Sequence, residues 1–160
     1  MEIAVDSMLG RLARWLRMLG LDTKYFNNLS DDEILKIASQ EKRIILTRDY
    51  QFFRKANAYG VKAIFVEGKT HVERLANLSR LLGINLEIDI ERSRCPKCNS
   101  NIRPVDKREI KEKVPESTYK TYNEFWICVG CGQVYWKGAH WKRINSILNQ
   151  ARRLAQQMVG

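Results

Sequence analysis

The four cysteines of this 160-residue chain form two pairs whose spacing could hold a metal ion. Two residues separate Cys95 from Cys98, and two separate Cys128 from Cys131. Four thiolates in such pairs are the ligands of a tetrahedral Zn²⁺ site, and the 29 residues between the pairs suit a zinc ribbon. Two disulfides or a dithiol redox motif are the alternatives. Because the N-terminus lacks a secretory signal, which argues against an oxidising compartment, we predict a closed, structural Zn²⁺ site.

Aspartates placed just after predicted strands are the second set of residues that could do chemistry. Asp6 ends a short apolar run, and Asp49 follows a longer one. Asp31 and Asp32 open the helix that follows the strand between those two. The carboxyl ends of parallel strands meet at one edge of a sheet, so these carboxylates could converge on Mg²⁺ or Mn²⁺. A simpler role as helix caps is open for Asp31, Asp32 and Asp49, whereas Asp6 has no obvious local role.

The positive charge of the chain is concentrated in its second part. The formal net charge is +10, yet residues 1–91 contain 14 Lys and Arg against 13 Asp and Glu. Residues 92–160 contain 14 basic against 5 acidic residues. A cationic module beside a neutral domain favours a polyanionic partner such as RNA, although a solvated basic face would have the same composition.

Basic residues in two segments are candidate RNA contacts. Three arginines recur on one predicted helix directly after Asp6, where they could guide an RNA backbone or simply form a solvated face. In the second part, aromatic and basic residues are interleaved, as on surfaces that stack unpaired bases and bind phosphates. Packing in the ribbon core is the alternative for these rings, and we favour it for Phe125 and Trp126. The predicted RNA-binding residues are Arg11, Arg14, Arg17, Arg48, Lys137, His140, Lys142 and Arg143.

Alternating strand and helix patterns position these residues in the first part of the chain. Strand-like runs occupy residues 3–5, 23–26, 43–47 and 61–66, and helical patterns occupy 9–19, 30–40, 50–59 and 71–82. This alternation predicts a three-layer, mainly parallel α/β domain over residues 1–91. A zinc ribbon over 92–139 and a basic amphipathic helix over 140–160 would follow. We expect a hinge at 83–91 and a hairpin tip or mobile loop at 106–122.

The sequence also bears on the location of the protein and its assembly. No run approaches the roughly 18 apolar residues of a membrane span, so we expect a soluble cytoplasmic protein with no membrane partner. The apolar stripe of the terminal helix could pack on its own chain or on a second copy. The oligomeric state therefore stays open.

Several longer motifs are specific enough to indicate a family. They are the stretch from Asp6 to Gly20, the acidic turn Asp31-Asp32-Glu33, the run Leu46-Thr47-Arg48-Asp49, the two cysteine pairs, and the stretch from Tyr135 to Trp141. Together they resemble the Mut-7 C-terminal RNase domain family over residues 3–143. That resemblance implies a PIN-like nuclease fold followed by a zinc ribbon.

The resemblance further implies a metal-dependent endoribonuclease that hydrolyses RNA phosphodiester bonds. Asp6, Asp31 and Asp49 match the catalytic aspartates of the PIN-like site, and Asp32 is a further candidate ligand for Mg²⁺ or Mn²⁺. Gln51 departs from the pattern, because many PIN-like chains have another acid there. A non-catalytic RNA-binding or ribosome-associated protein on the same fold is the alternative. The expected partner is single-stranded or structured RNA, with ribosomal RNA and tRNA among the candidates.

Overall fold

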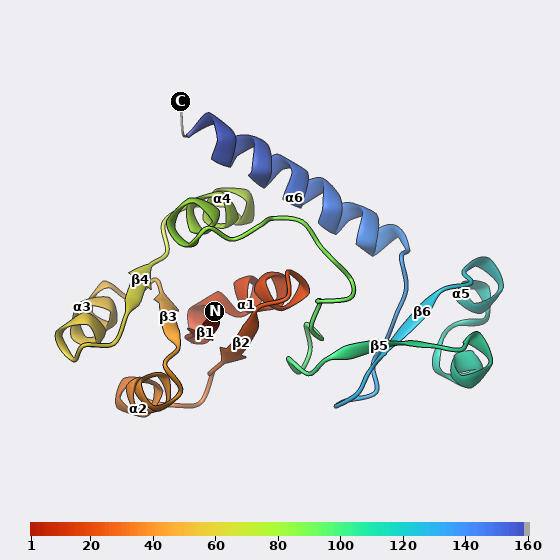
Figure 1. Ribbon diagram of the computed structural model, residues 1–160, viewed down its shortest axis with the longest axis horizontal. Helices are drawn as coiled ribbons and strands as arrows, with labels where there is room; N and C mark the ends of the chain where they lie inside the picture. Colours follow the sequence, from red (N-terminus) through yellow and green to blue (C-terminus); the bar gives the residue numbers. More distant parts are fainter. Residues whose placement is uncertain (159–160) are drawn as a thin grey trace.

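A computed structural model describes residues 1–158 as an α/β domain, a small antiparallel sheet and a long terminal helix (Figure 1). The last residues of the predicted terminal helix, 159–160, lie outside the described residues. The elements are β1 (Glu2–Val5), η1 (Ser7–Leu9), α1 (Gly10–Met18), β2 (Asp22–Tyr25), α2 (Asp31–Glu41), β3 (Ile44–Thr47), α3 (Tyr50–Ala58), β4 (Ala63–Phe65), α4 (His71–Leu82), β5 (Ile102–Val105), η2 (Lys107–Lys113), α5 (Glu116–Thr121), β6 (Phe125–Cys128), β7 (Val134–Tyr135) and α6 (Ala139–Gln157). Among these helices, none is both long and apolar enough to cross a membrane.

The main sheet consists of four parallel strands in the order β2-β1-β3-β4. From β1 the chain moves to β2 on one side, and it later adds β3 on the other side of β1. The strand order therefore reverses between β1 and β3. In open parallel sheets, ligands bind outside the carboxyl ends of the strands at such a switch point.

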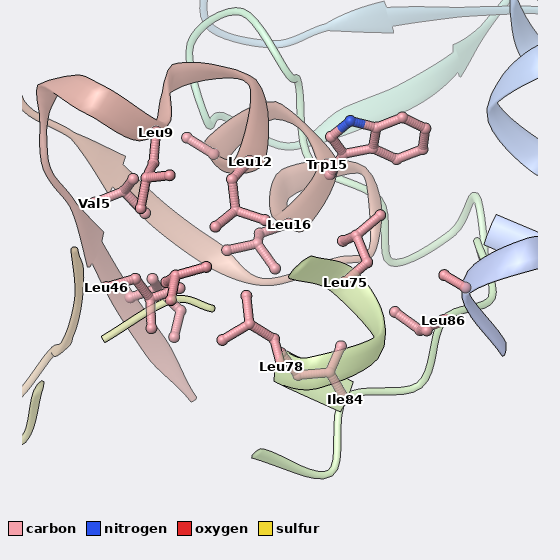
Figure 2. Packing of buried hydrophobic residues seen from close by; sticks show 14 of the residues in the cluster. Val5, Leu9, Leu12, Trp15, Leu16, Leu46, Leu75, Leu78, Ile84 and Leu86 are labelled. Atoms are coloured by element: carbon pink, nitrogen blue, oxygen red, sulfur yellow. The ribbon is translucent and has the colours of Figure 1, made fainter. Parts of the chain in front are cut away.

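Helices cover both faces of this sheet because successive side chains along a strand point to opposite faces. Ile3, Val5 and Leu46 pack with α1 and α4 on one face. Ala4 and Ile45 pack with α2 and α3 on the other. Figure 2 shows the first face, with Val5, Leu9, Leu12, Trp15, Leu16, Leu46, Leu75, Leu78, Ile84 and Leu86 labelled. The predicted three-layer α/β fold is confirmed.

Capping boxes define where two of these helices begin. At α2, the hydroxyl of Ser30 accepts the N–H of Glu33 at 3.2 Å, and the Glu33 carboxylate accepts the N–H of Ser30 at 2.8 Å. Thr70 and Glu73 form the same box at α4, which ends at Gly83 with a φ of 69°. Each cap stabilises its helix by about 1 kcal/mol, and the helix boundaries agree with those predicted.

The terminal helix α6 packs along α4 on the outer side of the domain (Figure 1). Its side chains Ile144, Leu148 and Ala151 belong to the same buried cluster as Leu75 and Leu78 of α4. Burial of one large aliphatic side chain contributes about 1.5–3 kcal/mol. The apolar stripe of this helix therefore packs on its own chain.

The second part of the chain is built on the antiparallel sheet β5-β6-β7. Phe125 and Trp126 are 2% and 7% exposed, as predicted. The expectation of a hairpin tip or mobile loop at 106–122 is wrong, because this segment forms η2 and α5. Ile110, which is fully buried, anchors the segment in a small core with Phe125 and Val134. A single apolar residue among charged neighbours has no periodicity that would reveal this packing.

Hydrogen bonds around the first cysteine pair join the small sheet to the main domain. The guanidinium of Arg17 donates to the carbonyl oxygens of Thr23 at 2.8 Å and Pro96 at 2.9 Å. The side chain of Asn99 accepts the N–H of Thr23 at 3.0 Å and donates to the carboxylate of Asp22 at 2.8 Å. We call these contacts of Arg17 and Asn99 the seam.

The connection between the two parts is also anchored. Ile84 and Leu86 of the expected hinge, 83–91, are buried in the main core. The hydroxyl of Ser93 donates to the carbonyl oxygen of Met18 at 2.7 Å. This connection is therefore packed against the domain along its length.

Candidate active site and metal centre

Asp6 lies at the carboxyl end of β1, at the switch point of the sheet, and is 7% exposed. Its Oδ2 accepts a hydrogen bond from the Thr47 hydroxyl, and its Oδ1 accepts the N–H of Met8 at 3.2 Å. Burial raises the pKa of Asp6, these two hydrogen bonds lower it, and the charges of Asp49 and Asp31 raise it further, so that the pKa is raised overall. A carboxylate buried near two others is costly to ionise, and a bound cation would offset that cost.

Asp49 follows β3 and caps α3. Its Oδ1 accepts the N–H groups of Gln51 at 3.0 Å and Phe52 at 3.2 Å. Its Oδ2 has no hydrogen-bond partner within residues 1–158. The capping role that the sequence left open is therefore present, and it leaves the second oxygen of this exposed carboxylate for a ligand.

The three acidic residues at the start of α2 make different interactions. Asp32 forms an ion pair with Lys55 of α3 at 2.6 Å, and Glu33 closes the capping box. Asp31 is exposed and makes no hydrogen bond or ion pair with the described residues. Its charge reaches Asp6, whose pKa it raises. The charge of Asp31 therefore acts on Asp6, whereas the carboxylate of Asp32 is paired with Lys55.

The acidic side chains form a looser group than the cysteines do. Across the described residues, the cysteines are the one group of three or more potential ligands whose atoms all lie within 4.8 Å of one another. Asp6, Asp31 and Asp49 are thus more widely spaced than a closed cage of ligands. Mg²⁺ usually takes one or two carboxylates and retains several waters, so the chemistry of these donors is compatible with it.

Thr47 links two of these aspartates. Its hydroxyl donates to Asp6 and accepts the N–H of Asp49 at 2.9 Å, and its side chain is fully buried. Thr47 therefore fixes the carboxylate of Asp6 relative to the start of the turn after β3. The hydrogen bond of Thr47 to Asp6 could not be predicted from the sequence, because the partner of a hydroxyl depends on strand order.

Replacing Thr47 with Val should raise the pKa of Asp6 further, because the hydrogen bond that is lost lowers it. An NMR titration of the Asp6 carboxyl carbon measures this directly. Thr47→Ser keeps a hydroxyl and should titrate like the wild type. If Asp6 titrates identically in Thr47→Val, the hydroxyl does not control its ionisation.

The four cysteines form a compact group at the tip of the small sheet. The Sγ atoms of Cys95 and Cys131 lie 3.8 Å apart, and those of Cys98 and Cys128 lie 3.4 Å apart. Zn–S bonds of about 2.3 Å place the ligands of a tetrahedron about 3.8 Å from one another, whereas a disulfide requires about 2.05 Å. The cysteines are therefore free thiols that could bind a zinc ion.

Neighbouring groups orient the cysteine sulfurs. The Tyr135 hydroxyl lies 2.9 Å from Sγ of Cys95. The N–H groups of Gly130 and Cys131 donate to Sγ of Cys128 at 3.3 and 3.4 Å. A Cβ at Gly130 would collide with the side chain of Ser100, so the turn requires glycine. Burial raises the pKa of Cys95 to about 11 and outweighs the Tyr135 hydroxyl, which lowers this pKa.

The arginines of α1 differ from one another. Arg11 and Arg14 are exposed, and with Lys97 they line a groove of about 410 Å³ between α1 and the first cysteine pair. We call this the cationic groove. Arg17 is only 9% exposed and belongs to the seam. Arg17 also lines the cationic groove, so the RNA contact predicted at this residue stays a prediction.

The other predicted RNA contacts also separate into two groups. The guanidinium of Arg48 donates to the carbonyl oxygen of Val66 at 2.5 Å and lies 5.6 Å from the centre of the Phe65 ring. Arg48 is therefore engaged at the end of β4, and its RNA contact stays a prediction. Four other residues are exposed at the start of α6 or just before it: Lys137, His140, Lys142 and Arg143.

These features place the protein in the class of PIN-like α/β domains that carry a zinc ribbon. Comparison with protein families shows that residues 1–148 match the Mut7-C RNAse domain, and the chain belongs to this family. Membership indicates a ribonuclease-like role with RNA as the substrate. No curated protein and no solved structure matches the chain.

Proposed function

We propose that this protein is a metal-dependent endoribonuclease whose active site surrounds Asp6. The observation that carries the proposal is the buried Asp6 carboxyl at the switch point, with its pKa raised by burial and by the charges of Asp49 and Asp31. Perturbed carboxyl groups of this kind are typical of functional sites. The family match supports RNA as the substrate class.

Each residue of the proposed site has a distinct role. Asp6, Asp31 and Asp49 would hold Mg²⁺ or Mn²⁺, and Thr47 keeps the Asp6 carboxylate in position. The bound ion would supply an activated water and balance the charge that develops on the phosphoryl oxygens. Arg11 and Arg14 would bind the RNA backbone along the cationic groove.

The second part of the chain would bind and orient the RNA. We propose that Cys95, Cys98, Cys128 and Cys131 hold a structural Zn²⁺ with no open coordination position. The exposed basic residues Lys137, His140, Lys142 and Arg143 would contact phosphates. In this proposal residues 1–91 form the nuclease domain, 92–139 the ribbon and 140–160 a basic helix. Free thiols suit a reducing compartment, which supports a cytoplasmic location.

The test is cleavage of labelled RNA with added Mn²⁺ or Mg²⁺ and without divalent ions. Single-stranded and structured RNAs are compared, with Ca²⁺ as a matched ion that occupies oxygen sites. The metal-free arm uses metal-depleted buffer, because a strong chelator would also remove zinc. Internal cleavage with Mn²⁺ or Mg²⁺ alone is the expected result.

A second candidate function has specific support. Gln51 stands where another acid is common in PIN-like chains, and Asp32 is paired with Lys55. Both observations favour a non-catalytic RNA-binding or ribosome-associated protein. RNA binding without cleavage under every metal condition would support this candidate and contradict the nuclease.

A further inference from the structure

A pocket of about 470 Å³ lies where the small sheet, α6 and the segment after α4 meet. Trp126, Trp136 and Trp141 line this pocket together with apolar residues such as Met18 and Ile90. Pockets of 300–1,000 Å³ with mainly apolar walls and a few polar groups typically bind small organic groups. Within residues 1–158, no Asp or Glu lines this pocket, so it would not repel an anionic ligand.

We propose that this pocket binds an unpaired nucleobase of an RNA strand. Every base has an aromatic face, and stacking on Trp side chains is a general way to hold single-stranded RNA. The exposed side chains of Gln133 and His140 also line the pocket and offer hydrogen-bonding groups to the edge of a base. The pocket therefore combines flat apolar walls with polar groups at its margin.

The charge beside the pocket favours a nucleotide over an apolar protein side chain. The Lys137 ammonium lies 5.6 Å from the centre of the Trp126 ring and 5.5 Å from that of Trp141. A cation held next to two stacking rings can meet the phosphate of a nucleotide whose base enters the pocket. The excess of basic over acidic residues in 92–160 supports the same occupant.

The pocket also adjoins the cationic groove. Pro96 lines both cavities, with Arg14 and Lys97 on the groove side. The groove reaches Tyr25, whose hydroxyl donates to the carbonyl oxygen of Ser7 at 2.9 Å. Ser7 directly follows Asp6. An RNA strand with one base in the pocket would thus run through the groove to the carboxyl edge of the sheet; this last step rests on the proposed nuclease function.

Binding of a short, fluorescent single-stranded RNA in metal-depleted buffer tests the base pocket. Trp141→Ala should weaken binding about 5- to 100-fold, the range for loss of one stacked base, and Trp141→Phe should retain most of it. Tyr59→Ala removes a ring that is 72% exposed outside the pocket, and should bind like the wild type. A Trp141→Ala variant with unchanged melting temperature and unchanged affinity would overturn the proposal.

Replacing single nucleotides with abasic sites identifies the base itself. The base pocket predicts one position at which loss of the base weakens binding about 5- to 100-fold in the wild type and much less in Trp141→Ala. A flat profile would overturn the proposal. Free AMP that binds as tightly as the RNA would also overturn it, because the pocket would then serve a small molecule.

A second variant avoids any change in the apolar walls. Lys137→Gln should weaken RNA binding and reduce the slope of log affinity against log salt by about 0.7, as loss of one phosphate contact to a single strand does. Lys62→Gln removes an exposed lysine of the main domain and should change neither quantity. If the two variants behave alike, Lys137 is not at the mouth of the base pocket.

These measurements separate the base pocket from the nuclease proposal because they need no divalent metal and no cleavage. If loss of one base weakens binding and no cleavage occurs, the base pocket is supported and the nuclease proposal is contradicted. If metal-dependent cleavage occurs and no single base affects binding, the nuclease proposal is supported and the base pocket is contradicted.

Discussion

Asp6→Asn should lower metal-dependent RNA cleavage by about 10³-fold or more while leaving RNA binding unchanged. The substitution removes the buried carboxylate ligand of the proposed site, and metal-assisted charge stabilisation contributes several kcal/mol to such reactions. The Asn oxygen can still accept the Thr47 hydroxyl, whereas the hydrogen bond from the Met8 N–H is lost. Single-turnover cleavage with Mn²⁺ and binding in metal-depleted buffer measure the two effects. Full activity in Asp6→Asn would place the chemistry elsewhere.

The same substitution should stabilise the metal-free protein. The pKa of Asp6 is raised above its unfolded value, so the folded state binds the proton more tightly. The stability that this proton contributes is present below the unfolded pKa and is lost as the pH rises through the folded pKa. Above the folded pKa, the ionised, buried carboxylate therefore costs free energy that a neutral Asn does not.

Thermal unfolding with and without Mn²⁺ checks this sign. Asp6→Asn should unfold at a higher temperature than the wild type in metal-depleted buffer, by roughly 2–4 °C for each kcal/mol gained. Mn²⁺ should raise the unfolding temperature of the wild type, because the ion binds preferentially to the folded state. In Asp6→Asn, Mn²⁺ should no longer raise the unfolding temperature. Glu87→Gln removes an exposed acid outside the site and should change neither value. A lower unfolding temperature for Asp6→Asn would mean that the ionised carboxylate supports the fold.

Loss of the zinc ion should unfold the small sheet and weaken the whole protein. The buried core of that sheet consists of Ile110, Phe125 and Val134, which is too small to fold alone. Structural zinc contributes about 10–16 kcal/mol in comparable peptides at neutral pH. Cys95→Ala should therefore lose bound zinc and show a much lower unfolding temperature. Tyr135→Phe removes only the hydroxyl beside Cys95, and it should keep the metal.

The seam extends this effect to the main domain. Pro96 and Asn99 flank the cysteines of the first pair and bond to Arg17, Thr23 and Asp22. Without zinc these contacts should loosen, and the cationic groove beside Lys97 should lose one wall. Zinc content, circular dichroism melting and cleavage are measured together. A main domain that melts at an unchanged temperature in Cys95→Ala would show that the seam does not couple the two parts.

Features that depend on local sequence patterns could be predicted from the sequence. The strands around Val5 and Leu46 are apolar runs, and the helices carry periodic stripes with capping boxes such as Ser30 and Glu33. The cysteine spacing indicated the metal centre. The position of Asp6 at the carboxyl ends of the strands was predicted from the rule that sites in parallel sheets form there.

Features that depend on distant partners could not be predicted in this way. Arg17 shares its spacing with Arg11 and Arg14, yet it is buried because Pro96 lies against it, 79 residues along the chain. Ile110 is buried because it packs with Phe125 of β6 and Val134 of β7. The base pocket requires three separated segments. Local sequence patterns predict which residues form a helix or strand. They do not predict which helices and strands pack together, because those contacts form between residues far apart in the sequence.

The packing of α6 on α4 has a consequence for how the protein is made. Leu75 and Leu78 of α4 share their core with Leu148 and Ala151 of α6, with the entire zinc ribbon between them in the chain. During synthesis the first sheet can therefore form early, but its outer apolar layer stays uncovered until the ribosome has released residue 151. Throughout that interval the nascent chain exposes an apolar surface of the kind that chaperones bind, and the proposed nuclease is not yet complete beside the RNA of the ribosome.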